Sequence, residues 1–204
     1  MPFQTLDDYH TDIRCRTGLN NGIFTTVSSD HAPSKYDHGL GKKQGLLNFK
    51  QIPNGLPGLE TRMPTLFCEG VLKGRLTPQK YVELMCSNPA KLYGLGDRKG
   101  VISPGYDADL VIWYPDVPTS GKSSMEPFRL SNGNLHHDID YTPFEGLEYA
   151  NWPRYTILRG AIVWDRDHGG ILGSKNAGRF LKRGASTLSK PRQVFVNEFH
   201  PYES

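Results

Sequence analysis

A carboxylate and an imidazole follow directly on a short β-rich run near the start of the chain. Residues 23–27 are β-branched or aromatic, Asp30 and His31 come three residues later, and Pro33 prevents a regular continuation. In an α/β barrel, the carboxyl end of a strand is where catalytic and metal-binding side chains are placed. The alternative is an aspartate that accepts backbone N–H bonds in a turn. The sequence predicts a strand over residues 23–27 that delivers Asp30 to a loop.

Three further motifs follow Asp30 in a fixed order. They are residues 52–62 (IPNGLPGLETR), 88–95 (NPAKLYGL) and 99–113 (KGVISPGYDADLVIW). Each motif is common alone, but the ordered set resembles the last third of the cyclic-amide hydrolases of the amidohydrolase superfamily. These are the dihydropyrimidinase and hydantoinase family. The resemblance runs from about residue 18 to about residue 183.

The resemblance implies an α/β fold. Family members are (β/α)₈ TIM-barrel metal-dependent hydrolases with a small β-sandwich domain beside the barrel. Such a barrel needs roughly 250 residues, so we expect only its C-terminal portion here. Residues 1–95 would supply the last strand and helices of an incomplete barrel, and residues 96–183 the β-sandwich domain with a loop-rich insert at 115–151. Residues 184–204 would be a C-terminal tail.

The resemblance also implies zinc-dependent hydrolysis of the C–N amide bond in cyclic ureides or imides. Family members hold two zinc ions by a His-x-His pair, a carboxylated lysine, two further histidines and one aspartate. Only the aspartate has a match, Asp30, which would ligate zinc, act as general base toward the attacking water and then protonate the leaving amide nitrogen. Catalytic zinc sites need about three protein ligands. We therefore expect the isolated chain to be inactive.

Asn54 matches the asparagine that contacts the substrate ring in these enzymes. An asparagine offers both a donor and an acceptor, as the alternating N–H and C=O groups of a cyclic ureide require. Its structural alternative is a tight turn, because Asn-Gly is a strong turn dipeptide. Both roles are compatible with one another.

Other polar residues near these motifs are assigned structural roles. His31 points away from Asp30 on an extended strand, which favours a hydrogen bond to a loop over metal coordination. Lys42 and Lys43 are interpreted as solvated. Glu60 and Arg62 are predicted to form an ion pair, and the sequential histidines and the aspartate of residues 136–138, within the loop-rich insert, are predicted to lie on the surface.

A non-catalytic alternative comes from the same resemblance. The dihydropyrimidinase-related scaffold proteins share the fold and bind partners without metal, but the presence of Asp30 favours the hydrolases. Related enzymes are homotetramers, and the basic segment 175–192 would serve as a solvated tail or reach a neighbouring subunit.

Composition excludes several classes of partner. The net charge of +3 is small and interspersed, which argues against nucleic acid. We found no apolar run of roughly 18 residues and no signal-peptide pattern, so we expect a cytoplasmic protein without a membrane span. Cys15, Cys68 and Cys86 lack a C-x-x-C spacing and are expected to be reduced thiols.

Local patterns predict helices in the first half of the chain and strands in the second. Apolar spacing predicts a helix over residues 65–73, and Thr77-Pro78 opens a second. Asn88-Pro89 has the same arrangement of a capping residue before proline, and it predicts a short helix that ends at Gly94. Strands are expected at residues 109–114, 155–158 and 161–164, the last two forming a hairpin around Arg159-Gly160. Long surface loops are expected over 115–151.

Overall fold

The structure is a computed structural model that describes residues 17–115 and 125–188. These residues form two compact units, each assembled from separate stretches of chain. The first unit comprises Ser28–Arg75 and Val111–Tyr155, and the second comprises residues 17–27, Leu76–Leu110 and residues 156–188. Cys15 and the end of the basic segment 175–192 lie outside the described residues.

One helix runs through the first unit. Helix α2, Arg62–Leu66, continues directly into the π-helical stretch η3, Phe67–Leu72, as predicted for residues 65–73. The helix ends at Gly74, which has φ +67°. The Gly74 N–H donates to Val71 O (2.9 Å) and the Arg75 N–H to Gly70 O (2.8 Å), the paired bonds of a Schellman cap.

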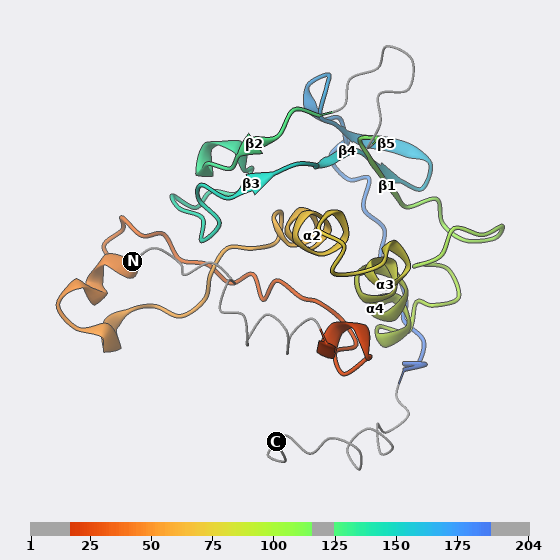
Figure 1. Ribbon diagram of the computed structural model, residues 1–204, viewed down its shortest axis with the longest axis horizontal. Helices are drawn as coiled ribbons and strands as arrows, with labels where there is room; N and C mark the ends of the chain where they lie inside the picture. The colour runs from red at the N-terminus through yellow and green to blue at the C-terminus, as the bar shows by residue number, and fades with distance from the viewer. Residues whose placement is uncertain (1–16, 116–124, 189–204) are drawn as a thin grey trace. The chain divides into compact units, whose positions relative to one another are not determined.

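The core of the first unit lies where the sequence predicted surface loops. Strand β2, Phe128–Arg129, pairs antiparallel with β3, Glu148–Tyr149. Leu130, Tyr149 and Trp152 are at most 3% exposed and pack with Cys68 of η3, and Figure 1 shows both strands beside α2. The prediction of surface loops is therefore wrong for β2, Leu130 and β3, whereas most of the residues between them are irregular and at least partly exposed, as predicted. These strands have two residues each, too few for an alternating pattern to be visible in the sequence.

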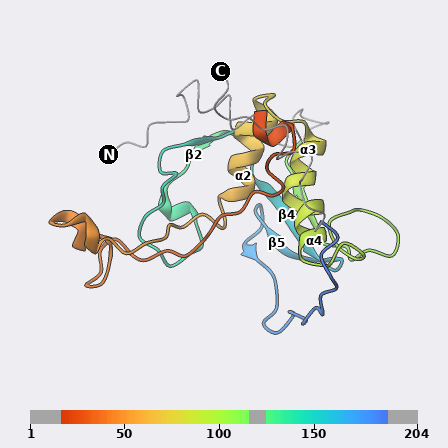
Figure 2. The same cartoon turned by 90° about the horizontal axis from the view of Figure 1, so that it is seen from below.

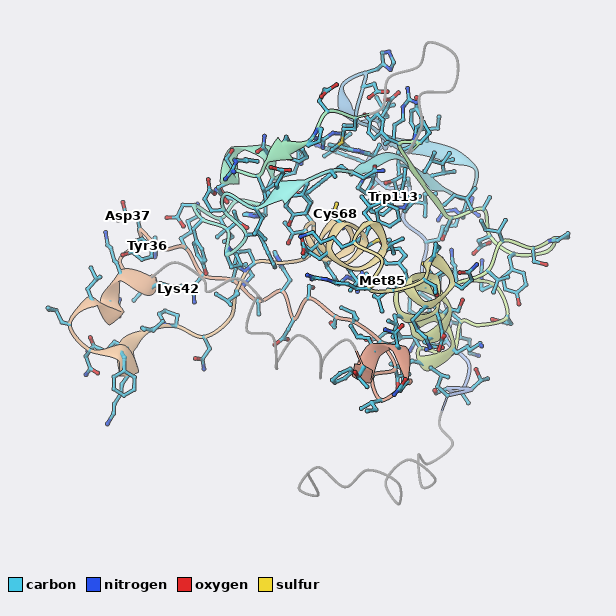
Figure 3. The ribbon with its side chains drawn as sticks, viewed as in Figure 1. Tyr36, Asp37, Lys42, Cys68, Met85 and Trp113 are labelled. Atoms are coloured by element: carbon cyan, nitrogen blue, oxygen red, sulfur yellow. The ribbon has the colours of Figure 1, made fainter. Side chains whose placement is uncertain are left out.

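Polar groups inside this core are hydrogen-bonded. The Thr65 and Tyr149 hydroxyls lie 2.7 Å apart, and the Cys68 thiol donates to Asn151 O at 3.2 Å. The Asn151 side chain accepts from the Tyr114 N–H (3.3 Å) and donates to Tyr114 O (3.0 Å). Burial without these partners would cost about 1 to 3 kcal/mol per group. Cys68, labelled in Figure 3, is thus an ordinary buried thiol.

The second unit is built around one long helix. Helix α3, Pro78–Val82, the π-helical η4, Glu83–Ser87, and helix α4, Asn88–Leu92, follow one another without a break. The predicted N-cap is confirmed: the Thr77 hydroxyl accepts the Lys80 N–H at 3.1 Å. The predicted end is also confirmed, because Gly94 has φ +67° and Leu95 N–H donates to Ala90 O.

Asn88 does not begin a separate helix, contrary to the prediction. Its backbone is already helical, and its N–H donates to Glu83 O five residues earlier. The side chain is nearly buried and donates to Thr25 O at 2.9 Å. A π-helical turn before Pro89 explains the continuity, because proline removes a regular helical hydrogen bond and a local widening of the helix accommodates that loss.

A four-stranded sheet contains β1, Leu110–Trp113; β4, Pro153–Leu158; β5, Ala161–Asp165; and β6, Gly170–Ile171, in the order β1-β4-β5-β6. The predicted hairpin between β4 and β5 is confirmed. Arg159 and Gly160 have φ +48° and +84°, as a tight type I′ turn requires. Strand β6 is too short to have been predicted.

The strand expected over residues 23–27 is absent. This segment has no ladder hydrogen bonds, and the nearest β contact is an isolated parallel bridge between His31 and Leu56. β-branched residues favour an extended backbone but do not supply the neighbouring strand that makes it a β-strand.

The described residues confirm a partial α/β fold with one four-stranded sheet and the β2–β3 pair, whereas the small β-sandwich is not confirmed. The predicted domain boundaries stay a prediction. Among the described helices, none has the length and apolar character that crossing a membrane requires.

Candidate functional site

Asp30 occupies an exposed position with an unusual backbone conformation. Its φ is +45°, in the left-handed region. Aspartate and asparagine tolerate this region better than other residues with a side chain. The residue type therefore suits the backbone, and the carboxylate remains accessible to a ligand.

His31 is anchored to a second segment of the chain. Its backbone forms the parallel bridge to Leu56, and its Nδ1 accepts the N–H groups of Gly58 (3.1 Å) and Leu59 (3.2 Å). The Nδ1 lone pair is therefore occupied by two backbone donors. The predicted loop hydrogen bond of His31 is confirmed.

The backbones of these two segments touch. Gly55 has φ +89°, and a Cβ at this position would lie 1.9 Å from the Ala32 carbonyl oxygen. The His31–Leu56 bridge joins the same two segments; Asp30 directly precedes His31, and exposed Asn54 directly precedes Gly55. The two residues singled out from the sequence, separated by more than twenty positions, therefore come from segments in direct contact.

A lysine anchors the loop that leads to Asn54. The loop carries the short 3₁₀ helices η1, Lys42–Leu46, and η2, Phe49–Gln51, and extends away from α2 (Figure 2). The Lys42 ammonium group donates to Pro53 O at 2.7 Å, directly before Asn54. The interpretation of Lys42 as a solvated residue is therefore wrong, whereas Lys43 pairs with exposed Asp37.

Residues of the insert bind the chain that follows Asp30. The Asp140 carboxylate accepts the Tyr36 and Asp37 N–H groups, both at 2.7 Å. These bonds hold the pKa of Asp140 below its usual value, and the bond from the Asp37 N–H has the largest effect. Lys35 and Asp138 add a surface ion pair (3.1 Å). Figure 3 shows Tyr36 and Asp37 on the segment that follows Asp30. Asp140 was not predicted as a site residue, because no local pattern in the sequence signals a contact across 103 residues.

The two histidines of the insert have different environments. His136 is half exposed, in agreement with the prediction, and binds Glu60 through its ring Nδ1 and its backbone N–H, each at 2.8 Å. His137 is partly buried, which corrects its assignment to the surface. Its ring lies 6.3 Å from the His31 ring, measured between centroids, with a tilt of 58°. The insert is thus packed against both segments of the candidate site.

The described residues do not fit a complete zinc centre. Within 17–115 and 125–188, no three histidine, cysteine, aspartate or glutamate side chains gather closely enough to hold a metal ion. His31, next to Asp30, uses its Nδ1 lone pair for two backbone N–H groups, so this nitrogen is not available as a second ligand. Asp30 remains a single carboxylate where about three ligands are needed.

The sequence matches a known family model over most of its length. Residues 11–163 match the model of the amidohydrolase family. The chain is 36% identical to the D-hydantoinase of Ralstonia pickettii over 165 residues, which cover 81% of this chain and 33% of that protein. It is also 36% identical to a D-phenylhydantoinase of Escherichia coli, with the same coverage.

Solved structures give the same result. The dihydropyrimidinase of Brevibacillus agri superposes with a TM-score of 0.75 at 34% identity, covering 87% of this chain and 35% of that one. The L-hydantoinase of Arthrobacter aurescens gives a TM-score of 0.67 at 32% identity, covering 80% and 33%. The chain therefore spans about a third of the length of the relatives that it matches.

Proposed function

Because the chain belongs to the amidohydrolase family, in the group of hydantoinases and dihydropyrimidinases, we propose that it is the C-terminal part of a cyclic amidohydrolase. The whole hydrolase would cleave the C–N amide bond of cyclic ureides or imides. The observation that carries this proposal is the contact between the Asp30 and Asn54 segments at Gly55. It joins the two segments that carry the carboxylate of Asp30 and the amide of Asn54.

Asp30 would move the proton in this reaction. Its carboxylate accepts a proton from the water whose oxygen forms the new bond to the ring carbonyl carbon. The same proton then passes to the ring nitrogen as the C–N bond breaks, which regenerates the carboxylate and releases an open-chain product. The exposure of Asp30 supports this role, because its carboxylate is accessible, and aspartate tolerates the left-handed backbone at this position.

Asn54 would bind the ring. Its amide offers one acceptor oxygen and an NH₂ donor group, which match an adjacent N–H and C=O of a ureide. Lys42, through Pro53 O, and Gly55, against Ala32, fix the backbone on both sides of it. A fixed amide loses little freedom when the substrate binds.

Amidohydrolases are generally metal-dependent, and zinc with Asp30 as one ligand is part of the proposal. The described residues supply no complete ligand set. We therefore propose that the 204-residue chain alone does not open hydantoin or dihydrouracil, and that the remaining ligands are supplied by other residues. A homotetramer in the cytoplasm is proposed for the whole hydrolase on the family resemblance.

The test supplies the missing part of the barrel. The chain is co-expressed with the N-terminal two thirds of a hydantoinase, and ring opening is followed with hydantoin and dihydrouracil. Asp30→Asn tests the carboxylate directly, because asparagine tolerates φ +45° and the substitution removes only the charge. We expect it to lower kcat by about 10²- to 10⁴-fold, whereas Asp138→Asn, a control at an exposed ion pair, leaves kcat unchanged.

Asn54→Ala should instead raise KM more than it lowers kcat, because it removes contacts made in both the ground state and the transition state. Turnover by the short chain alone that survives Asp30→Asn would contradict the proposal. A folded complementation complex without any turnover would favour the non-catalytic scaffold alternative.

A further inference from the structure

We propose that His31 is a positioning residue, which keeps the Asn54 segment beside Asp30 by holding the turn at Gly58 and Leu59. The substrate and proton-transfer roles of Asn54 and Asp30 rest on the proposed function. The contacts of His31 do not, because they belong to the described chain.

The His31 ring serves two backbone donors at once. Its Nδ1 accepts Gly58 N–H at 3.1 Å and Leu59 N–H at 3.2 Å. The turn begins helix α2, since Gly58 O accepts the Arg62 N–H at 3.0 Å. Without the imidazole acceptor, two amide groups ahead of the helix would have no partner from this ring, and such donors seek another partner or water. Loss of His31 therefore loosens the turn.

A displacement of the turn would be transmitted to Asn54. Only three residues separate Asn54 from Gly58, and each is constrained: Gly55 lies against Ala32 O, Leu56 forms the bridge to His31, and Pro57 is buried. Proline fixes its own φ, and the preceding residue is restricted as well. This short connection has little freedom to absorb a shift at Gly58.

A second imidazole lies beside the His31 ring. The His137 ring lies 6.3 Å away with a 58° tilt, and the Nδ1 of His137 accepts the Ile139 N–H at 3.2 Å. His137 is therefore held in place by its own segment. The His137 ring thus lies beside the His31 ring, while the two backbone N–H bonds direct Nδ1 at the turn.

Three substitutions of His31 distinguish the effect of its hydrogen-bond acceptor from the effect of its ring. In His31→Asn, the side-chain oxygen comes close to the position of Nδ1 and can accept the same N–H groups. In His31→Gln the oxygen extends toward the position of Nε2, and in His31→Leu there is no acceptor. The matched control is His38→Leu, because His38 Nδ1 also accepts a backbone N–H, that of Leu40 at 3.1 Å, in the exposed loop.

The first measurement is amide hydrogen exchange on the 204-residue chain, which requires no activity. We expect His31→Leu and His31→Gln to raise the exchange rates of Gly58 and Leu59 by about tenfold or more, and His31→Asn to keep them within about threefold of the original. His38→Leu should affect Leu40 only. Unchanged exchange in His31→Leu, or equal acceleration in His31→Asn, would overturn the assignment of His31 as the acceptor that holds this turn.

The second measurement is ring opening in the complemented hydrolase. We expect His31→Leu to raise KM by about tenfold with kcat within about threefold, and His31→Asn to restore KM. A fall in kcat with unchanged KM would overturn the positioning role. If no variant, including the original, shows turnover, the proposed function fails, and the exchange rates still decide whether His31 holds the turn.

Discussion

At the scale of single residues, Asp140 shows how a surface carboxylate can organise a loop. It accepts two adjacent backbone N–H groups, at Tyr36 and Asp37, and lies at an exposed position. These bonds favour its ionised form and lower its pKa. The stabilisation is therefore present above the usual aspartate pKa of about 3.9 and is lost as the pH falls through the lowered value.

We expect the Tyr36 and Asp37 amides to lose protection below about pH 4, as Asp140 becomes protonated and accepts these bonds less well. Amide exchange, corrected for its intrinsic pH dependence, measures this loss. In Asp140→Asn, protection should be lower and should not change with pH in this range. Protection that falls equally in both proteins would argue against Asp140 as its source.

Tyr149 has a raised pKa, in contrast to the lowered pKa of Asp140. Burial raises its pKa to about 12, although the hydrogen bond with Thr65 opposes this shift. The unfolded chain loses the phenol proton near pH 10, so the folded state is favoured below that value and loses stability as the pH rises toward 12.

Between about pH 9 and pH 11, this difference should cost about 1.4 kcal/mol of unfolding free energy. Urea unfolding of the original chain and of Tyr149→Phe measures it, because the variant lacks the ionisable group and should lose that much less stability. Tyr93→Phe, at an exposed tyrosine, should behave like the original chain. If Tyr149→Phe showed the same pH dependence as the original chain, the pKa of Tyr149 would not differ between the folded and unfolded states.

At the scale of elements, a glycine decides how closely the Asp30 and Asn54 segments approach. Gly55 and Gly105 have nearly equal φ angles, +89° and +87°. A Cβ at Gly55 would overlap the Ala32 carbonyl oxygen, whereas a Cβ at Gly105 would meet nothing within 4 Å. The pair therefore separates backbone strain from the close contact.

Gly105→Ala should lower the unfolding free energy by about 1 to 2 kcal/mol, the cost of a left-handed backbone with a side chain. Gly55→Ala should lower it by clearly more, because the segments must also move apart. Urea unfolding gives both values, and faster exchange at Gly58 and Leu59 should accompany Gly55→Ala alone. Equal losses of stability would mean that the two segments separate without cost.

At the scale of the whole molecule, many large apolar side chains are exposed. Leu46, Leu47 and Phe49 of the loop with η1 and η2 are 74%, 98% and 75% exposed, and Ile112, Ile162 and Ile171 of the four-stranded sheet are also exposed. Exposed apolar patches of this kind promote association.

We expect the 204-residue chain to self-associate, as seen by size-exclusion chromatography with light scattering. Replacing Leu46, Leu47 and Phe49 by serine should shift the distribution toward smaller species, since it removes apolar area without touching a buried residue. Replacing exposed Lys50 by serine controls for a change in the same loop. A monodisperse monomer for the unaltered chain would rule out this expectation.

Features that depend on a few neighbouring residues were predictable from the sequence. The Thr77-Pro78 helix start, the Gly94 helix end and the Arg159-Gly160 turn are fixed by local sterics and local hydrogen bonds. The four ordered motifs likewise identified the family, which the comparisons confirm.

Contacts between distant segments were decided only by the tertiary structure. The core around Tyr149 and Trp152, the Asp140 bonds and the approach of Gly55 to Ala32 join residues far apart in sequence, for which no local pattern exists. Asn88 shows the same limit, because its side chain donates to Thr25 O, a partner 63 residues away that no local pattern indicates. The sequence determined which residues could do chemistry. Packing of the chain determined which of their segments lie side by side, because hydrogen bonds and buried contacts form between neighbours in space.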